Sequence, residues 1–196
     1  MAVRNDFAAG EVLAAADLND TFAAKADLAS PAFTGTPTVN GTAIEDLSGL
    51  TFIANGSVTS GSSIIFNNCF TTFRNFRIVV VSNASTSIRL RASGSDAAGS
   101  DYNLQYGLAN GTSMTAARSN ATSWLLTAGA SYMVVDVIDP NSAAPTLAWS
   151  YAITGGTNVA LADFGLQHNV STAYDGFSVL GSSMTAQAWV YGYQQS

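Results

Sequence analysis

The chain has very few of the residues on which most catalytic and metal-binding sites depend. Its 196 residues include one cysteine, Cys69, one histidine, His168, and one lysine, Lys25. A single cysteine excludes an intrachain disulfide and any cysteine-based zinc site. One histidine cannot supply the paired ligands of a zinc hydrolase, and Lys25 lies in no glycine-rich phosphate-binding loop. We therefore expect no metal and no cofactor, with Cys69 as a small buried hydrophobic residue.

Charge is also scarce, and it is unevenly distributed. Charged residues make up 10% of the chain, and the net charge is −6. Residues 1–50 carry two basic and seven acidic residues, whereas residues 51–196 carry five arginines and six aspartates. No basic patch is available to neutralise a nucleic-acid backbone, so we expect no nucleic-acid binding. The acidic first part suits docking on a more basic surface, or it is simply solvated.

Long hydrophobic runs are missing as well. The longest strongly apolar run, Ile78–Val81, is far too short to cross a bilayer. The apolar stretch Leu13–Ala16 is too short for a signal peptide, and Glu11 and Asp17 flank it. We expect no membrane insertion.

Residues 1–28 predict an extended lead followed by a short helix. Ala14–Lys25 is rich in alanine, the best helix former. Leu18 and Phe22 lie four residues apart, on one helical face. A lone helix of about a dozen residues is marginal in water, so this apolar stripe needs shelter. Either three copies pack around a threefold axis with both side chains inside, or the helix packs on the body of its own chain.

Residues 29–50 predict an extended, β-rich neck. Pro31 and Pro37 exclude a helix because proline fixes φ and removes an amide donor. The run Val39–Ile44 carries an Asn-Gly turn signal between two apolar positions.

Residues 51–196 alternate between apolar and polar positions, which is the signature of β-strands. The alternating runs include Phe76–Val80, Ile88–Leu90, Met133–Val137, Leu147–Ile153 and Trp189–Tyr193. Glycine, asparagine and serine clusters separate them at short intervals. Ile88 and Leu90 are expected to face inward, and Arg89 and Arg91 outward. We count nine or ten strands with little helix, which predicts a mainly β protein built as a jelly-roll-like antiparallel sandwich.

Two segments of the first fifty residues carry a family resemblance. Residues 7–19 read F-x-x-G-x-V-L-x-A-x-D-L-N, and residues 29–38 read A-S-P-x-F-T-G-T-P-T. Together they resemble the N-terminal segments of bacteriophage tail-fibre and related virion proteins. The resemblance implies a homotrimeric structural protein and not an enzyme. In it, Phe7, Val12 and Leu13 anchor the chain to the particle, and Leu18 and Phe22 form the trimer core.

A second segment, residues 64–80, is similar to a pattern of spaced aromatic residues in C-terminal modules of phage fibre and virion proteins. Phe73 and Phe76 stand where tyrosines are commoner. The later Leu90 and Tyr102 also match that pattern. This resemblance implies a β-sandwich head displayed outward.

Several side chains of the head are candidates for contact with a bacterial surface glycan. Arg77, Arg89 and Arg91 share one outer face if their strands pair as a hairpin, where they could bind phosphate or carboxylate groups. Their alternative role is ion pairing with aspartates of the same or a neighbouring subunit. Aromatic residues near predicted loops could stack on sugar rings, or they form core and subunit interfaces. The main aromatic candidates are Tyr102, Trp124 and Tyr174.

Catalytic arrangements can be drawn from the same residues, but the sequence disfavours them. His168 with Asp163 or Asp175 could form a serine-hydrolase triad, and pairs of aspartates could cleave glycosides. However, His168 ends a strand pattern, where a structural role is typical, and the head contains no glutamate. We expect no catalytic residue.

These observations predict a phage tail fibre, made in the bacterial cytoplasm and located in the virion. Residues 1–28 attach to the particle, residues 29–50 form a neck or shaft, and residues 51–196 form the head. The expected partners are two further copies, another virion protein of the tail, baseplate or capsid, and a host surface polysaccharide. The alternatives are a capsid head fibre or decoration protein, a tail adaptor or collar protein without host contact, and a depolymerase.

Overall fold

The computed structural model describes residues 38–39, 42–43, 49–110, 112–125, 129, 131–154 and 160–194. The chain forms two compact units, Met1–Ile44 and Glu45–Ser196. The described residues contain thirteen strands and no helix. The predicted helix, with its trimer-core residues Leu18 and Phe22, lies outside them. So do the predicted anchoring residues, Phe7, Val12 and Leu13.

In the first unit, the described residues form one short hairpin. Strand β1 (Thr38–Val39) pairs antiparallel with β2 (Thr42–Ala43), and Val39 lies opposite Thr42. The two strands flank the Asn-Gly turn signal of the sequence.

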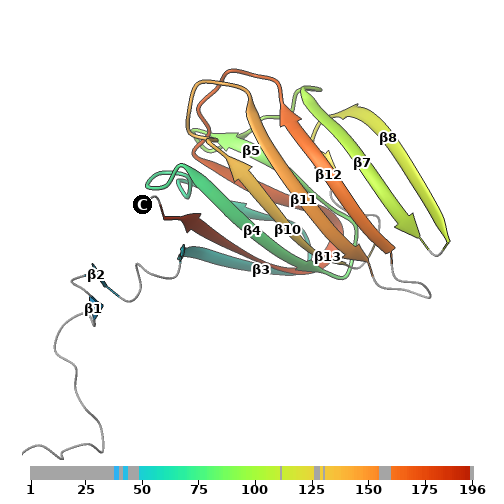
Figure 1. The fold of residues 1–196 in the computed structure, drawn as a ribbon, viewed down its shortest axis with the longest axis horizontal. Coiled ribbons are helices and arrows are strands. Elements are labelled where there is room, and N and C mark those ends of the chain that lie inside the picture. The colour runs from blue at the N-terminus through green and yellow to red at the C-terminus, as the bar shows by residue number, and fades with distance from the viewer. Residues whose placement is uncertain are drawn as a thin grey trace, which may run out of the picture. The chain divides into compact units, whose positions relative to one another are not determined.

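The second unit is a single antiparallel sheet of eleven strands (Figure 1). Its strands are β3 (Leu50–Phe66), β4 (Asn75–Ser82), β5 (Thr86–Ala92), β6 (Ser95–Asp96), β7 (Tyr102–Asn110), β8 (Ser113–Ala121), β9 (Trp124–Leu125), β10 (Ser131–Ile138), β11 (Thr146–Thr154), β12 (Ala160–His168) and β13 (Gly176–Tyr193). Along the sheet they follow the order β6-β5-β13-β4-β10-β11-β12-β7-β8. In addition, β3 pairs with β13, and β9 pairs with β5. The mainly β fold expected from the alternating pattern is confirmed.

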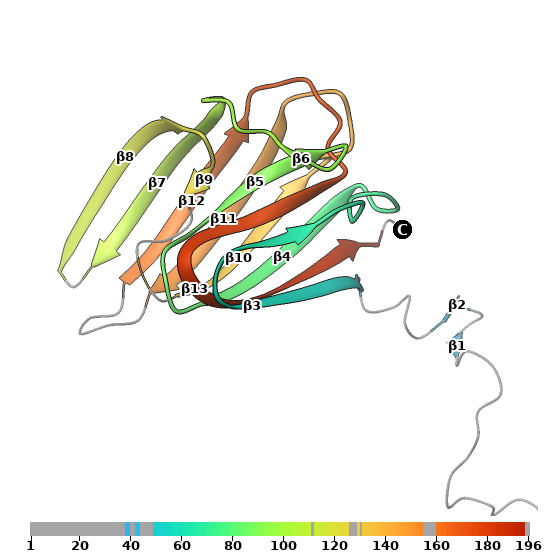
Figure 2. The ribbon, with the colours of Figure 1, turned by 180° about the vertical axis from the view of Figure 1, so that it is seen from behind.

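Strand β13 curls this sheet over onto itself. Its first half, Gly176–Gly181, pairs with β5, and its second half, Ala186–Gly192, pairs with β4. Between the two halves the register against β3 shifts twice, and Ser183 adopts a positive φ of 49°. Such bulges bend a strand and increase its twist. Figure 1 looks onto the layer of β8, β7, β12, β11, β10 and β4, and Figure 2 onto the layer of β5, β6 and the first half of β13.

The core fills the space between these two layers. Phe70 stacks on Phe177 of β13 at 5.6 Å between ring centroids and contacts Phe76 of β4 at 4.6 Å. Tyr102 of β7 packs edge-on against Trp124 of β9. Its hydroxyl accepts a hydrogen bond from the Leu90 amide at 3.0 Å and donates one to the Ala97 carbonyl at 2.9 Å. The bond from Leu90 of β5 to Tyr102 of β7 joins the two layers directly.

One sequence expectation about strand pairing is wrong. Strands β4 and β5 follow each other in the chain, but they do not pair, because β13 lies between them in the sheet. Arg77 on β4 therefore lies on a different layer from Arg89 and Arg91 on β5, and the three do not share an outer face. Ile88 and Leu90 face the core as predicted.

Candidate functional site

The layer from β4 to β8 turns one face to the core and the other to solvent. In an antiparallel ladder, residues directly opposite each other point to the same side of the sheet, so the outward residues of these strands form rows. One row consists of Val81, Tyr132, Ile153, Leu161, Ala109 and Met114, in register across β4, β10, β11, β12, β7 and β8. We call it the apolar row. Its five large side chains are between 42% and 83% exposed.

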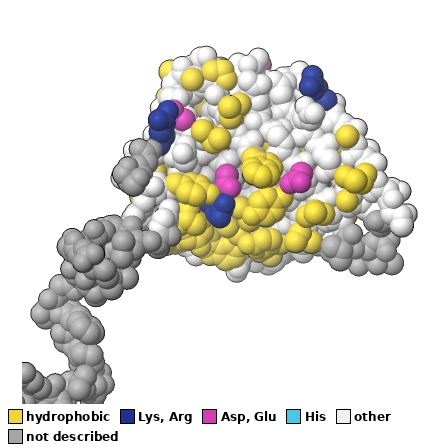
Figure 3. Space-filling view, in the orientation of Figure 1, with side chains coloured by type: hydrophobic (Ala, Val, Ile, Leu, Met, Phe, Trp, Pro, Cys, Tyr) yellow, Lys and Arg dark blue, Asp and Glu magenta, His cyan; other side chains and the backbone are white. Residues whose placement is uncertain are grey.

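Hydrophobic side chains gather widely over this face, as Figure 3 shows. Besides the apolar row they include Trp149, Tyr151, Leu147 and Ile138. Strand β11 thus turns its large apolar residues outward, while its inner face consists of the small residues Thr146, Ala148, Ser150 and Ala152. Soluble monomers rarely expose contiguous apolar patches of more than a few hundred Å², and larger patches mark sites of interaction.

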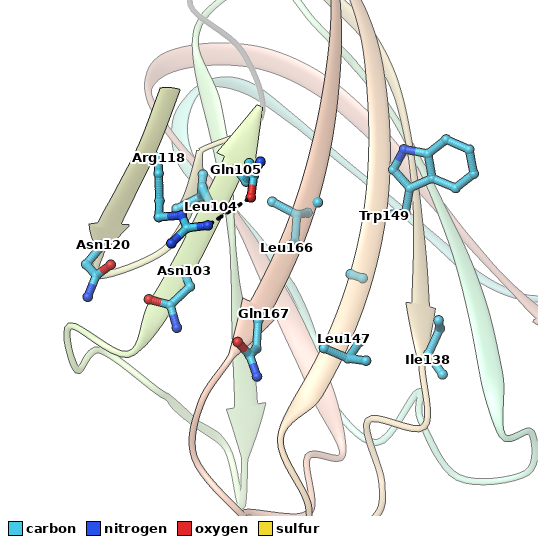
Figure 4. A pocket seen from close by; sticks show the side chains of 12 residues that line it. Asn103, Leu104, Gln105, Arg118, Asn120, Ile138, Leu147, Trp149, Leu166 and Gln167 are labelled. Atoms are coloured by element: carbon cyan, nitrogen blue, oxygen red, sulfur yellow. Dashed lines mark hydrogen bonds between the residues drawn. The ribbon is translucent and has the colours of Figure 1, made fainter. Parts of the chain in front are cut away.

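A shallow groove of about 680 Å³ crosses the same face at the other end of these strands (Figure 4). Two adjacent rows build it. In the first row, Trp149, Gly165, Gln105 and Arg118 are successive partners across β11, β12, β7 and β8. The second row runs through Ile138, Leu147, Gln167, Asn103 and Asn120.

The two sides of the groove differ in chemistry. On the β10–β11 side lie Ile138, Leu147 and Trp149, whose side chain is 58% exposed. The β12, β7 and β8 side is polar and consists of Gln167, Asn103, Gln105, Asn120 and Arg118. Arg118 Nη2 donates a hydrogen bond to Gln105 Oε1 at 3.2 Å. Among the described residues, no carboxylate forms an ion pair with Arg118.

Glycine forms the floor between these two sides. Gly165 faces outward in the middle of β12, and a Cβ atom there would meet its nearest neighbour, the Gln105 carbonyl oxygen, at 3.8 Å. Gly107, on β7, would meet nothing within 4 Å. Neither has the positive φ that requires glycine. Packing therefore explains neither glycine, and the missing side chains hollow the sheet face. Gly107 and Asp163 line an adjoining hollow of about 430 Å³ beyond Trp149 and Gly165.

A charged cluster lies in the same row as Trp149, toward β4. Arg77 donates from Nε and Nη2 to the two carboxylate oxygens of Asp136, each at 2.8 Å, and the Tyr193 hydroxyl donates to Asp136 Oδ1 at 2.6 Å. Burial opposes ionisation of Asp136, but the hydrogen bonds from Arg77 and Tyr193 outweigh it, so the pKa of Asp136 is lowered. Burial and the bond to Asp136 raise the pKa of Tyr193 to about 12. Arg77 is thus engaged by its own chain.

The other two arginines proposed for glycan contact are engaged as well. Arg89 donates to the Thr122 carbonyl at 2.8 Å and to its hydroxyl at 3.2 Å. Arg91, expected to face solvent, is buried instead. It forms an ion pair with Asp96 and donates to the Gly94 carbonyl, and it bonds to Asn67 and Ser178 at 3.0 Å each. Arg91 thus shows the ion pairing that the sequence left open as an alternative, whereas Arg89 is held by hydrogen bonds to Thr122.

The three aromatic candidates, Tyr102, Trp124 and Tyr174, all lie in the core, at most 3% exposed. They therefore present no ring to a ligand at the surface, and the core role that the sequence left open is the observed one. The Tyr174 hydroxyl is hydrogen-bonded to His168 Nδ1 at 3.0 Å, and burial lowers the pKa of His168. Cys69 is buried as expected, and burial raises its pKa to about 12.

The sequence interpretation missed Trp149, Arg118 and the amides of the groove. One signal in the sequence pointed to this place: a glycine at an outward position inside a strand pattern. The pairing of β11 with β12 was not visible in the sequence.

Compared with known protein families and with curated proteins, the chain matches none. The described residues include no helix that is long and apolar enough to cross a membrane. They also include no group of three or more potential metal ligands.

Proposed function

We propose that the protein is a structural fibre protein of a bacteriophage virion, with the tail as its place of attachment. Residues 1–28 anchor it to the particle, residues 29–50 align three chains, and residues 51–196 form the displayed head. The head adheres to the host surface by binding, without catalysis. The motifs in residues 7–19 and 29–38 support the anchoring role by resemblance.

The observation that carries the proposal is the exposed apolar row. A row of apolar side chains across six strands, five of them large and exposed, favours a protein that is completed by other subunits. A closed homotrimer covers such surfaces with copies of the same chain. Three heads on one support would also strengthen weak adhesion through their effective concentration.

The proposal includes a finer description of the head fold. We propose that the curled sheet is a jelly-roll-like sandwich. The support is that β13 contributes one half to each layer and that aromatic side chains fill the space between the layers.

Solution mass tests the assembly. Light scattering on the full chain should give three times the mass of one chain. Replacing Tyr132 and Leu161 of the apolar row by serine should weaken the assembly, whereas Leu125→Ser on β9, where Leu125 is 50% exposed, should not. A full chain that is monomeric at micromolar concentration would contradict the proposal.

Attachment requires a separate test on particles. Phage carrying the chain without residues 1–28 should lack the protein, while the purified shortened chain keeps a β-type circular dichroism spectrum. Imaging of labelled particles distinguishes tail attachment from the capsid alternative. Incorporation of the shortened chain at normal levels would show that residues 1–28 are not the anchor.

A further inference from the structure

We propose that the groove between Trp149 and Arg118 is a saccharide site for an oligosaccharide that carries a carboxylate. This deepens the adhesion part of the proposed function by naming the site and the class of ligand. Trp149 would pack against a sugar ring, the amides would bind hydroxyl groups, and Arg118 would bind the carboxylate.

The glycine floor is the first argument. Glycine weakens a strand, and inside strands it marks places where a ligand or another backbone approaches closely. Gly165 and Gly107 have room for a side chain, so neither is required by the fold. The missing side chains leave a hollow on the sheet face next to Trp149, the most exposed tryptophan among the described residues.

The chemistry of the two sides is the second argument. A sugar ring has an apolar face of C–H groups, which packs on an aromatic ring, and a rim of hydroxyl groups. The groove presents Trp149 on one side and the amides of Asn103, Gln105, Asn120 and Gln167 on the other. Each amide offers a donor and an acceptor, as a hydroxyl does. Four amides beside one exposed indole therefore match a saccharide better than they match a purely apolar ligand.

The positive charge of Arg118 is the reason for expecting an acidic ligand. Arg118 bonds to Gln105 and forms no ion pair with a described carboxylate, so its guanidinium can bind a carboxylate through two parallel hydrogen bonds. Asp163 lies beyond Gly165, in the adjoining hollow. Its charge disfavours the reverse orientation and directs the ligand's carboxylate toward Arg118. Trp149 and Arg118 are three strand spacings apart, about 14 Å, which calls for an oligosaccharide.

Two other ligand classes fit the groove less well. A peptide that adds a strand needs a free sheet edge, but the groove lies on a face, and β11, β12 and β7 are paired on both sides. A nucleic acid needs several cations to neutralise its phosphates, and Arg118 is the one cation among the groove residues.

The test is binding of the purified full chain to immobilised oligosaccharides. The array would hold uronic-acid-containing and neutral oligosaccharides of equal length, together with a capsular polysaccharide panel and single-stranded DNA. We expect binding to acidic members and not to the neutral counterparts. Trp149→Ala removes the aromatic ring on which the sugar packs, and Gly165→Val fills the groove. Each should weaken binding of the acidic oligosaccharides about tenfold or more. Arg118→Gln should abolish the preference for acidic over neutral sugars.

Matched controls separate the site from the fold. Phe52→Ala removes another exposed aromatic ring, on β3, and Ser57→Val places a valine at an exposed position of the same strand, outside the groove. Both should bind normally, and all variants should keep the parent's melting temperature within a few degrees. The proposal is overturned if no saccharide binds, if neutral sugars bind equally well, if only DNA binds, or if Trp149→Ala and Gly165→Val bind like the parent. Since the assay uses free protein, it stands or fails independently of particle attachment.

Discussion

Arg77 and Asp136 lie directly opposite each other on β4 and β10 and are joined by two parallel hydrogen bonds of 2.8 Å each. The pair sits among the apolar side chains of the outer sheet face, and Tyr193 closes it from β13. Each partner's side chain is about a third exposed. Covering by another subunit would desolvate it further, so the pair is already arranged to enter an interface without an unpaired charge.

Asp136→Asn should therefore destabilise the head, because it removes the charge that Arg77 and Tyr193 both bind. We expect a loss of about 1–2 kcal/mol in the free energy of unfolding, measured by urea denaturation. The control is Asp139→Asn, which breaks the pair of Asp139 with the mostly exposed Arg74 and should cost only a few tenths of a kcal/mol. Equal effects of the two variants would show that the partly buried pair of Arg77 and Asp136 contributes no more to stability than the exposed pair of Arg74 and Asp139.

The same cluster predicts two features of the pH dependence. Since the pKa of Asp136 is lowered in the folded state, its contribution is complete above the unfolded pKa and is lost as the pH falls through the folded value. For Tyr193, whose pKa is raised to about 12, the contribution is complete below the unfolded pKa, near 10, and is lost as the pH rises toward 12. Burial also raises the pKa of Tyr102 and of Tyr174, so ultraviolet titration should show several late tyrosines, and Tyr193→Phe should remove one of them.

Glycine substitutions should separate the floor of the groove from the core. Gly165→Ala should leave stability unchanged or raise it by about 0.5 kcal/mol, because a side chain fits and the unfolded chain loses freedom. Gly176→Ala should be severely destabilising, because its Cβ would lie 2.1 Å from the Phe66 carbonyl oxygen. Thermal unfolding measures both. A large loss with Gly165→Ala would mean that packing does require this glycine.

Cys69 should react very slowly with thiol reagents in the native protein. It is buried, and its pKa of about 12 leaves almost no thiolate at neutral pH. In denaturant, labelling by a chromogenic disulfide should be complete within minutes. Fast labelling of the native protein would show that the segment around Phe70 opens readily.

Much of the fold followed from local patterns. Phe76, Ile78 and Val80 alternate in the sequence and are buried together, and Cys69 is buried as its chemistry suggests. For β11 the alternating pattern showed which residues share a face, but it did not show which of the two faces is buried. The larger side chains, Trp149 and Tyr151, lie outside, and Ala148 and Ala152 lie inside. Which face is buried depends on the opposing layer, and that layer comes from distant parts of the chain.

Composition and period-two alternation are local properties, so the sequence alone was enough to predict a β protein with almost no residues for metal or covalent chemistry. Which strands are neighbours became clear only from the three-dimensional fold. It placed β13 between β4 and β5, separating Arg77 from Arg89, and it brought Trp149 and Arg118 onto one face with glycine between them. The physical reason is that strand pairing is a long-range choice. The alternation of apolar and polar residues repeats every two residues and is compatible with any neighbouring strand. Only packing between the layers selects one neighbour among the possible strands.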